Sequence, residues 1–335
     1  MRQLIKILTF TTLAAATTAC AHTLPNSDRA FKAFAAEMER KHHFPAAEVE
    51  KLLTSAEFRD DIIAAITRPA ESKPWHEYRP IFLKQSRIQG GVKFWRENQA
   101  LLERVSTEYG IPPEILVAIL GIETRYGKHT GRYHILDALR TLAFGYPKRA
   151  DFFRAELEQF LLLSREESLD PRNALGSYAG AMGKPQFISS SYRQYAVDGD
   201  GDGRRDLWQS DADVIASVAN YFKLHHWRPG EVVALRAERD GTGELQPFLD
   251  IGMQPSIPLA ELLAIGLQPM ENGKLDPDTL ISLIQLDAGD HNEYWFGLYN
   301  FYVITRYNHS NLYAMAVYQL SQEIVAAKQA AEAAR

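Results

Sequence analysis

The spacing of apolar residues predicts a mostly helical chain. Between residues 28 and 66, Phe31, Phe34 and Met38 recur three and four residues apart, as they do on one face of a helix. The same period predicts further helices at residues 91–109, 112–126, 135–144, 150–163, 189–196 and 211–226, and a last one from about residue 311. Residues 67–80 are rich in proline, so we predict a connection there.

The pattern changes after residue 230. Residues 232–237 and 280–287 are predicted to be strands and residues 256–265 a short helix, with frequent glycine and proline between them. A segment at residues 294–308 then contains seven aromatic residues, which suits either a core or a wall that binds carbohydrate. The predicted fold class is therefore α+β, predominantly helical, with a small β-rich insert.

The predicted helix at residues 112–126 is apolar nearly all round, which is typical of a buried helix. Pro112 and Pro113 open it and Gly127 follows its end, in agreement with the usual places of these residues. One carboxylate, Glu123, lies seven residues after Leu116 and four after Ile119, so the helical period places it on the apolar face.

Burial disfavours the charged form of a carboxylate, so we expect the pKa of Glu123 to be raised. A general acid near neutral pH needs such a shift. The alternative is a structural ion pair with Arg125 or Arg132, and periodicity alone leaves both interpretations open.

A glycine-rich loop follows at residues 176–187, where the glycines bracket Ser177 and Gln186. Glycine lets the backbone approach a ligand closely, which suits the wall of a groove, although a plain surface turn has the same composition. Ser177 is not part of a G-x-S-x-G motif and no His–Asp relay is evident, so a serine hydrolase is not indicated.

Residues 198–209 have the pattern of an EF-hand calcium loop. Asp198, Asp200 and Asp202 take the first, third and fifth positions, Gly203 the sixth, and Arg204 would bind through its backbone carbonyl at the seventh. The twelfth position is Gln209 where a bidentate Glu is usual, so the affinity should be low unless Asp211 substitutes in a longer loop. Three carboxylates this close repel one another unless a cation lies among them.

The first residues form a targeting signal. Arg2 and Lys6 precede an apolar run at residues 7–16 that is too short for a membrane span. The run ends near Cys20, the only cysteine in the chain, which predicts a bacterial lipoprotein acylated at Cys20. Thr17 stands where such signals prefer Leu, and cleavage after the A-x-A pattern at residues 19–21 would instead give a soluble periplasmic protein.

Composition and charge exclude several other classes. The net charge of −5 gives no basis for general binding to nucleic acid. No apolar run after the N-terminus reaches the roughly 20 residues that span a bilayer.

Four segments, in this order, resemble the B-type lytic murein transglycosylases: GIETRYG around Glu123, GSYAGAMGKPQF around Gln186, the DGDGDGRRDLW loop, and NFYVITRYNHS near the C-terminus. The resemblance covers residues 75–320. Ile188-Ser189 departs from it, because a proline is expected there, and so does Gln209 in the metal loop.

The resemblance implies a domain organisation. Residues 1–20 would be a lipoprotein signal, 21–100 an N-terminal α-helical domain, 101–230 a lysozyme-like catalytic core, 231–293 a small β-rich domain, and 294–335 an aromatic groove segment with the C-terminal helix.

The resemblance also implies an activity: cleavage of the β-1,4 bond between N-acetylmuramic acid and N-acetylglucosamine in peptidoglycan, leaving 1,6-anhydromuramic ends. Glu123 corresponds to the family's catalytic acid and base. The positions that match the family's substrate-binding groove are Ser177, Gln186, Tyr221, Tyr302, Tyr307, Asn308 and Tyr78.

The expected partners are peptidoglycan glycan strands, the outer membrane through the lipid anchor, and other cell-wall proteins, with the chain itself a monomer. Calcium is expected to be structural, and we expect no organic cofactor. Two alternatives remain: a hydrolytic muramidase, in which water attacks, and a calcium-responsive peptidoglycan-binding protein without catalysis.

Overall fold

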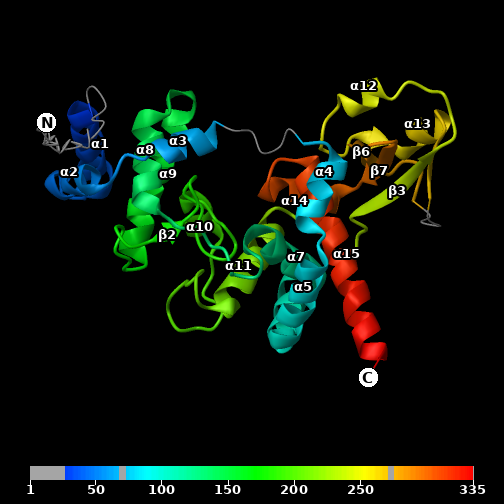
Figure 1. The fold of residues 1–335 in the computed structure, drawn as a ribbon, viewed down its shortest axis with the longest axis horizontal. Helices are drawn as coiled ribbons and strands as arrows, with labels where there is room; N and C mark the ends of the chain where they lie inside the picture. The colour runs from blue at the N-terminus through cyan, green and yellow to red at the C-terminus, as the bar shows by residue number, and fades with distance from the viewer. Residues whose placement is uncertain (1–26, 68–72, 271–274, 335) are drawn as a thin grey trace, which may run out of the picture.

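The computed structural model of the chain describes residues 27–67, 73–270 and 275–334, and most of these residues are helical (Figure 1). The predicted signal and Cys20 lie outside them. The helices are α1 Ser27–His42, α2 Ala46–Ser55, α3 Asp60–Ile66, α4 Trp75–Phe82, α5 Gln85–Glu97, α6 Gln99–Tyr109, α7 Pro113–Thr124, α8 Ile135–Gly145, α9 Ala150–Glu166, α10 Ser189–Tyr195, α11 Asp211–Leu224, α12 Gln246–Leu249, α13 Leu259–Ala264, α14 Tyr299–Tyr307 and α15 Asn311–Ala333.

Two of the helical predictions were wrong. The connection expected at residues 67–80 contains α4, which includes Pro80. This helix forms because Trp75 and Tyr78, three residues apart, are both buried in the core. The single helix expected at residues 91–109 is two helices that meet at Asn98, whose side-chain amide donates to the carbonyl of Phe94.

Five antiparallel strands form one sheet in the order β4-β6-β7-β3-β5. Their bounds are β3 Ala234–Arg239, β4 Ile257–Pro258, β5 Leu267–Pro269, β6 Leu280–Asp287 and β7 Asn292–Gly297. Both faces of the sheet are covered, because neighbouring residues such as Leu283 and Ile284 belong to two different apolar clusters. Burial on both faces explains why β6 reads as an almost continuous apolar run.

The boundaries in this region differ from the sequence prediction. The first predicted strand begins at Ala234 instead of residue 232, and the helix expected at 256–265 is the short strand β4 followed by α13. The aromatic segment at 294–308 is divided between the end of β7 and α14. Every aromatic residue of this segment therefore belongs to a strand or a helix, and none lies in an irregular loop.

The helices that precede α7 in the chain lie in two places. Phe31 and Phe34 of α1 pack with their rings against Phe144 of α8, so the first helices lie with α8 and α9 at one end of the molecule (Figure 1). α4 and α5 instead pack against α15 and α7, nearer the sheet. The domain boundaries given above remain predictions.

α7 lies in the middle of the molecule and carries Glu123 in its last turn (Figure 1). Every residue from Ile115 to Ile122 is buried, which confirms the expected buried helix. α15 packs along it, and Ser310 caps α15 by accepting a hydrogen bond from the amide of Tyr313. Among the described residues no single helix is long and apolar enough to cross a membrane; α6 and α7 pass that test only as a pair bent by 113°.

Candidate active site

Glu123 makes one direct contact with a side chain from the far end of the chain. The hydroxyl of Tyr313, in the first turn of α15, donates to Oε1 of Glu123 over 2.5 Å. Tyr313 is buried, and Glu123 keeps part of its surface exposed. The carboxyl group therefore lies among protein atoms but can still be reached from outside.

Burial raises the pKa of Glu123 from its ordinary value of 4.5 to about 7, and the hydrogen bond from Tyr313 lowers it in part. The negative charge of Glu123 in turn adds to the burial that raises the pKa of Tyr313. Near neutral pH, Glu123 is thus close to half protonated, which is the state that a group needs to act as acid and then as base.

The structural ion pair that the sequence left open is not formed. Among the described residues no Lys, Arg or His forms an ion pair with Glu123, and no cation contributes to the shift of its pKa. Arg125 is exposed, and so is Arg132. Glu123 is therefore a buried acid held by a neutral hydroxyl group.

The turn that ends α7 is strained and firmly held. Arg125 and Tyr126 both have left-handed backbone conformations, with φ of 50° and 62°, which cost energy for residues other than glycine. Thr124 bridges this turn to the glycine-rich loop, because its hydroxyl donates to the carbonyl of Lys184 over 2.8 Å and accepts from the amide of Gly127. Hydrogen bonds therefore join the end of α7, next to Glu123, to the glycine-rich loop.

The glycine-rich loop presents Ser177 and Gln186 in defined orientations. The Ser177 hydroxyl accepts hydrogen bonds from the amides of Ala179 and Ala181, a role that leaves its own proton to donate. The side-chain amide of Gln186 donates to the carbonyls of Thr130 and Gly183, so its oxygen is left to accept. The loop thus offers one donor and one acceptor.

Close backbone packing explains the glycines of this loop. Gly183 has φ of 68°, and a side chain there would meet the carbonyl oxygen of Leu207 at 2.4 Å. Gly131 has φ of 102° and packs against the backbone of Gly176, so that a Cβ atom at residue 131 would lie 2.0 Å from the carbonyl group of Gly176. A larger residue at either position would displace the loop.

A cluster of aromatic rings surrounds the Glu123–Tyr313 pair. Tyr307 stacks on Tyr313 with the ring centres 6.5 Å apart and donates its hydroxyl to the carbonyl of Pro185 over 2.6 Å. Tyr221 packs against Tyr307 at 4.8 Å, and its own hydroxyl donates to the carbonyl of Arg306. The rings thus connect α11, α14 and α15 to the glycine-rich loop.

The remaining residues predicted to bind substrate lie around this cluster. Tyr78 is buried on α4, and its charge would raise the pKa of Tyr313, so it lies near that residue. Tyr302 is half-buried on α14 with Arg306 over its ring at 5.8 Å. Asn308 is exposed directly after α14. Their contact with a substrate remains a prediction.

The predicted metal loop brings its three aspartates together. Oxygens of Asp198, Asp200 and Asp202 all lie within 4.8 Å of one another, and the three residues are exposed. Asp198 also accepts from the amides of Gly201 and Gly203, which lower the pKa of its carboxyl group. A set of three carboxylate groups on a loop folded around them fits a hard cation such as calcium.

The end of the metal loop is connected to the active site. Asp211, considered above as a substitute ligand for Gln209, forms an ion pair with Lys184 at 2.6 Å, so its charge is already compensated. The backbone amide of Lys184 donates to the carbonyl of Leu207. Gln209 is exposed, and its carbonyl accepts a long bond from Lys184. Lys184 therefore connects the metal loop to Thr124, the neighbour of Glu123.

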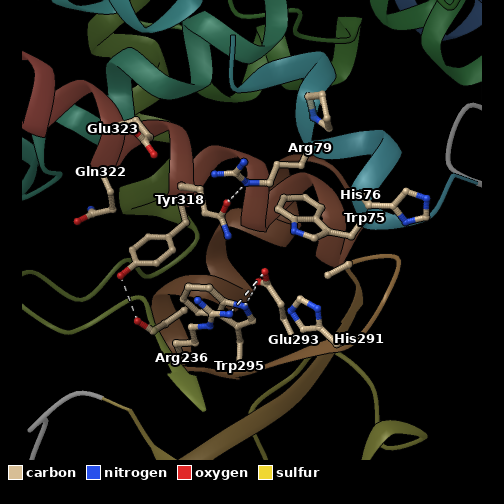
Figure 2. A pocket seen from close by; sticks show the side chains of 14 residues that line it. Trp75, His76, Arg79, Arg236, His291, Glu293, Trp295, Tyr318, Gln322 and Glu323 are labelled. Atoms are coloured by element: carbon tan, nitrogen blue, oxygen red, sulfur yellow. Dashed lines mark hydrogen bonds and ion pairs between the residues drawn. The ribbon is translucent and has the colours of Figure 1, made fainter. Parts of the chain in front are cut away.

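A separate cavity of about 670 Å³ lies between the sheet and the helices α4 and α15 (Figure 2). Glu123 is not among its lining residues. Its polar side chains largely pair with one another: Arg79 donates to Gln319, while Arg236 and the indole of Trp295 both contact Glu293. This cavity is therefore a second hollow of the molecule, apart from the candidate site at Glu123.

Sequence reasoning missed Tyr313, Thr124 and Lys184. Tyr313 lies on the buried face of α15 with Val317 and Leu320, so its spacing indicates a core residue. Nothing in the sequence pairs residue 313 with residue 123. The available signal was weak: Tyr313 is one more aromatic residue, five positions after the end of the segment at 294–308.

Comparisons with known proteins agree with this geometry. A family profile described as "Transglycosylase SLT domain" matches residues 26–322. The chain is 44% identical over 305 residues to the membrane-bound lytic murein transglycosylase B of Escherichia coli (strain K12), which covers 88% of this chain and 82% of that protein.

Two solved structures are also similar. The soluble lytic transglycosylase SltB1 from Pseudomonas aeruginosa is 46% identical with a TM-score of 0.83, over 90% of this chain and 99% of that one. The Escherichia coli lytic transglycosylase Slt35 in complex with calcium is 43% identical with a TM-score of 0.80, over 89% of this chain and 93% of that one.

Proposed function

This chain belongs to the transglycosylase SLT family and is a peptidoglycan lytic transglycosylase, and we propose that Glu123 works alone as its acid and base. One observation carries the proposal: burial and the Tyr313 hydroxyl account for the shifted pKa of Glu123. A second carboxylate at the spacing of a glycosidase pair would raise that pKa further, and among the described residues none does so.

In the first step, protonated Glu123 donates its proton to the glycosidic oxygen between N-acetylmuramic acid and N-acetylglucosamine as the bond breaks. A pKa of about 7 keeps enough of the acid form at neutral pH. The exposed part of the side chain gives the oxygen access to the proton.

In the second step, the Glu123 carboxylate removes the proton from the C6 hydroxyl of the muramic residue while that oxygen attacks C1. The product is a 1,6-anhydromuramic end, and the acid is regenerated. Because the nucleophile belongs to the substrate, no second reactant has to be recruited, which is a large entropic advantage when the geometry is right.

The glycine-rich loop is placed to hold the N-acetyl group of the sugar. The Ser177 hydroxyl can donate to the acetyl carbonyl, and the side-chain oxygen of Gln186 can accept from the acetamido N–H. These groups remain available because the other hydrogen bonds of both side chains are made to backbone groups. Such contacts would fix the sugar and support the positive charge that develops at C1.

The mass spectrum of digested peptidoglycan tests this mechanism. We expect products lighter by one water than those of hydrolysis, and none from Glu123→Gln, although that variant should still bind glycan strands. Reducing ends throughout would indicate a hydrolytic muramidase instead. Full activity in Glu123→Gln would remove Glu123 from its role.

Calcium binding is compatible with the relative Slt35, whose structure contains calcium. In this chain we assign the ion to the loop of Asp198, Asp200 and Asp202, with the Arg204 carbonyl and the Gln209 side chain completing the set. The role is structural, since the loop lies at the far end of the Lys184 connection and not at Glu123.

The related murein transglycosylase B is membrane-bound by name, and the related SltB1 is soluble. For this chain, membrane association fits an acyl anchor at Cys20, which would hold the enzyme at the periplasmic face of the outer membrane. Mass spectrometry of the mature N-terminus tests the anchor. An unmodified N-terminus after Ala21 would contradict it.

A further inference from the structure

A cavity of about 360 Å³ lies between the first turn of α5 and the turn that ends α7. Basic side chains dominate its wall, and no Asp or Glu of residues 27–67, 73–270 and 275–334 lines it. The basic residues are Lys84, Arg87, Arg125, Lys128 and His129. Such a one-sided concentration of charge, without compensation, attracts anions.

Arg87 is the buried member of this group, with only 7% of its surface exposed. Its Nη1 donates to the carbonyl of Ile81, but its Nε is buried and has no hydrogen-bond partner among the described residues. Burial lowers the pKa of Arg87, and the charge of Arg125 lowers it further, while no carboxylate opposes either effect. A buried guanidinium is normally paired with an anion.

The ordinary structural explanation covers only part of this cluster. Arg125 and Lys128 follow the C-terminus of α7, where cations interact favourably with the helix dipole. Lys84 and Arg87, however, flank the N-terminus of α5, where the dipole disfavours cations and favours anions.

We propose that this cavity binds an oxyanion, and that the oxyanion is a carboxylate of the peptide stems on the glycan strand. Arg125, which lines the cavity, lies two residues beyond Glu123 in the chain, so the cavity adjoins the turn that follows the proposed catalytic acid. The inference rests on the proposed function, because the stems belong to that substrate. Bidentate guanidinium contacts match the geometry of a carboxylate.

Cleavage kinetics with two substrates test the proposal: glycan strands that carry peptide stems, and the same strands after an amidase has removed the stems. The full-length enzyme should show a KM about tenfold lower for the peptide-bearing strands, the size of one charge-assisted hydrogen bond. Lys84→Gln/Lys128→Gln, which changes two exposed residues, should lose this preference with kcat unchanged. Arg87→Gln should lose it too, if it folds.

Lys93→Gln is the matched control, since Lys93 lies on the same helix, is 75% exposed and pairs with Glu97 outside the cavity. It should keep the preference. An unchanged preference in the double variant would overturn the proposal, whereas failure of the wild type to cleave either substrate would instead count against the proposed function.

Two further probes distinguish the source of the oxyanion. Inorganic phosphate and phosphatidylglycerol vesicles are each added to the wild type and to the double variant. We expect phosphate to compete weakly with the peptide-bearing strands and the vesicles not to bind. Vesicle binding that the double variant abolishes, with the stem preference intact, would overturn the assignment to stem peptides.

Discussion

At the residue scale, burial raises the pKa of Glu123 and the hydrogen bond from Tyr313 lowers it in part. The proposed mechanism requires the protonated acid, and its pKa is about 7, so kcat/KM should be constant in acid and fall above about pH 7. Tyr313 stabilises the charged form and so lowers this pKa. Tyr313→Phe should therefore move the basic limb of the pH profile upward, by about one pH unit.

Tyr307→Phe is the matched control for this shift. It also removes a buried tyrosine hydroxyl, but one that bonds to the carbonyl of Pro185 instead of Glu123. Its basic limb should stay near that of the wild type. Equal shifts in both variants would mean that general packing, and not the bond to Glu123, controls the pKa.

The buried acid should also cost stability at high pH. The pKa of Glu123 is higher in the folded chain than its ordinary value of 4.5, so its contribution to stability is fully present below about pH 4.5 and is lost as the pH rises through about 7. Glu123→Gln does not titrate. Relative to this variant, the wild type should lose up to about 3 kcal/mol of unfolding free energy between pH 4.5 and 8.

Denaturant unfolding at several pH values measures this difference. Glu114→Gln, in the first turn of the same helix, is the control for loss of one carboxylate from α7. A constant difference between wild type and Glu123→Gln over the whole range would show that Glu123 titrates in the folded chain as it does in the unfolded one.

The sequence allowed Glu123 to be predicted because one acid on an otherwise apolar helix conflicts with the pattern around it. Tyr313 fits the apolar pattern around it, since a tyrosine on the buried face of a helix is ordinary. Its partner lies 190 residues away in the chain. Side-chain pairs of this kind depend on the tertiary arrangement, which local periodicity does not contain.

At the element scale, the metal loop should stabilise the active site through Lys184. Calcium at the aspartates would fix the loop that precedes α11, while Asp211 at the start of α11 pairs with Lys184, and the Lys184 carbonyl accepts from Thr124. Removal of calcium by a chelator should lower the melting temperature by a few degrees. It should also reduce kcat with little change in KM.

Lys184→Met tests whether the effect on kcat travels along this path. The variant should have a kcat reduced about tenfold, and chelation should reduce it little further, because the connection is already broken. Asp200→Asn should weaken the response to calcium, whereas Asp278→Asn, an exposed aspartate in the β-rich region, should not. A full response to chelation in Lys184→Met would exclude this path.

Element predictions succeeded where one physical effect dominated. α8 and α11 have apolar periodicity and α7 is apolar nearly all round, and all three were predicted within a few residues. α4 was missed because Pro80 and its neighbours indicate a connection locally, while burial of Trp75 and Tyr78 stabilises the helix only in the folded molecule. Tertiary packing overrode local propensity at this position.

At the scale of the whole molecule, the order of the sheet could not be predicted from the chain. β3 pairs with β7 and β5, although some sixty residues separate the paired Ala234 and Gly297. The sequence pattern predicts that these segments are strands of a sheet, but it does not indicate which strands pair. The same limit applies to the surroundings of Glu123, where α7, α14, α15 and the glycine-rich loop are joined by hydrogen bonds.

The C-terminal helix α15 packs against several of these elements, so we expect cleavage activity to depend on how much of α15 is present. α15 packs against α7, α5 and α4, and its buried face runs from Tyr313 through Leu320 to Ile324. Beyond Ile324 the helix is mostly exposed, with Lys328 placed over the ring of Trp95. A truncation after Lys328 should therefore keep cleavage activity and change the melting temperature by only a few degrees.

A truncation after Val317 should have a different result, because it removes Leu320 and Ile324, each fully buried. Loss of two such side chains costs about 4–10 kcal/mol, which is of the order of the whole stability of a domain. Tyr313 would then lose the helix that holds it against Glu123. Circular dichroism and cleavage assays on both truncations measure this, and an active enzyme without residues 318–335 would show that Tyr313 is held by α14 and its stacking on Tyr307 alone.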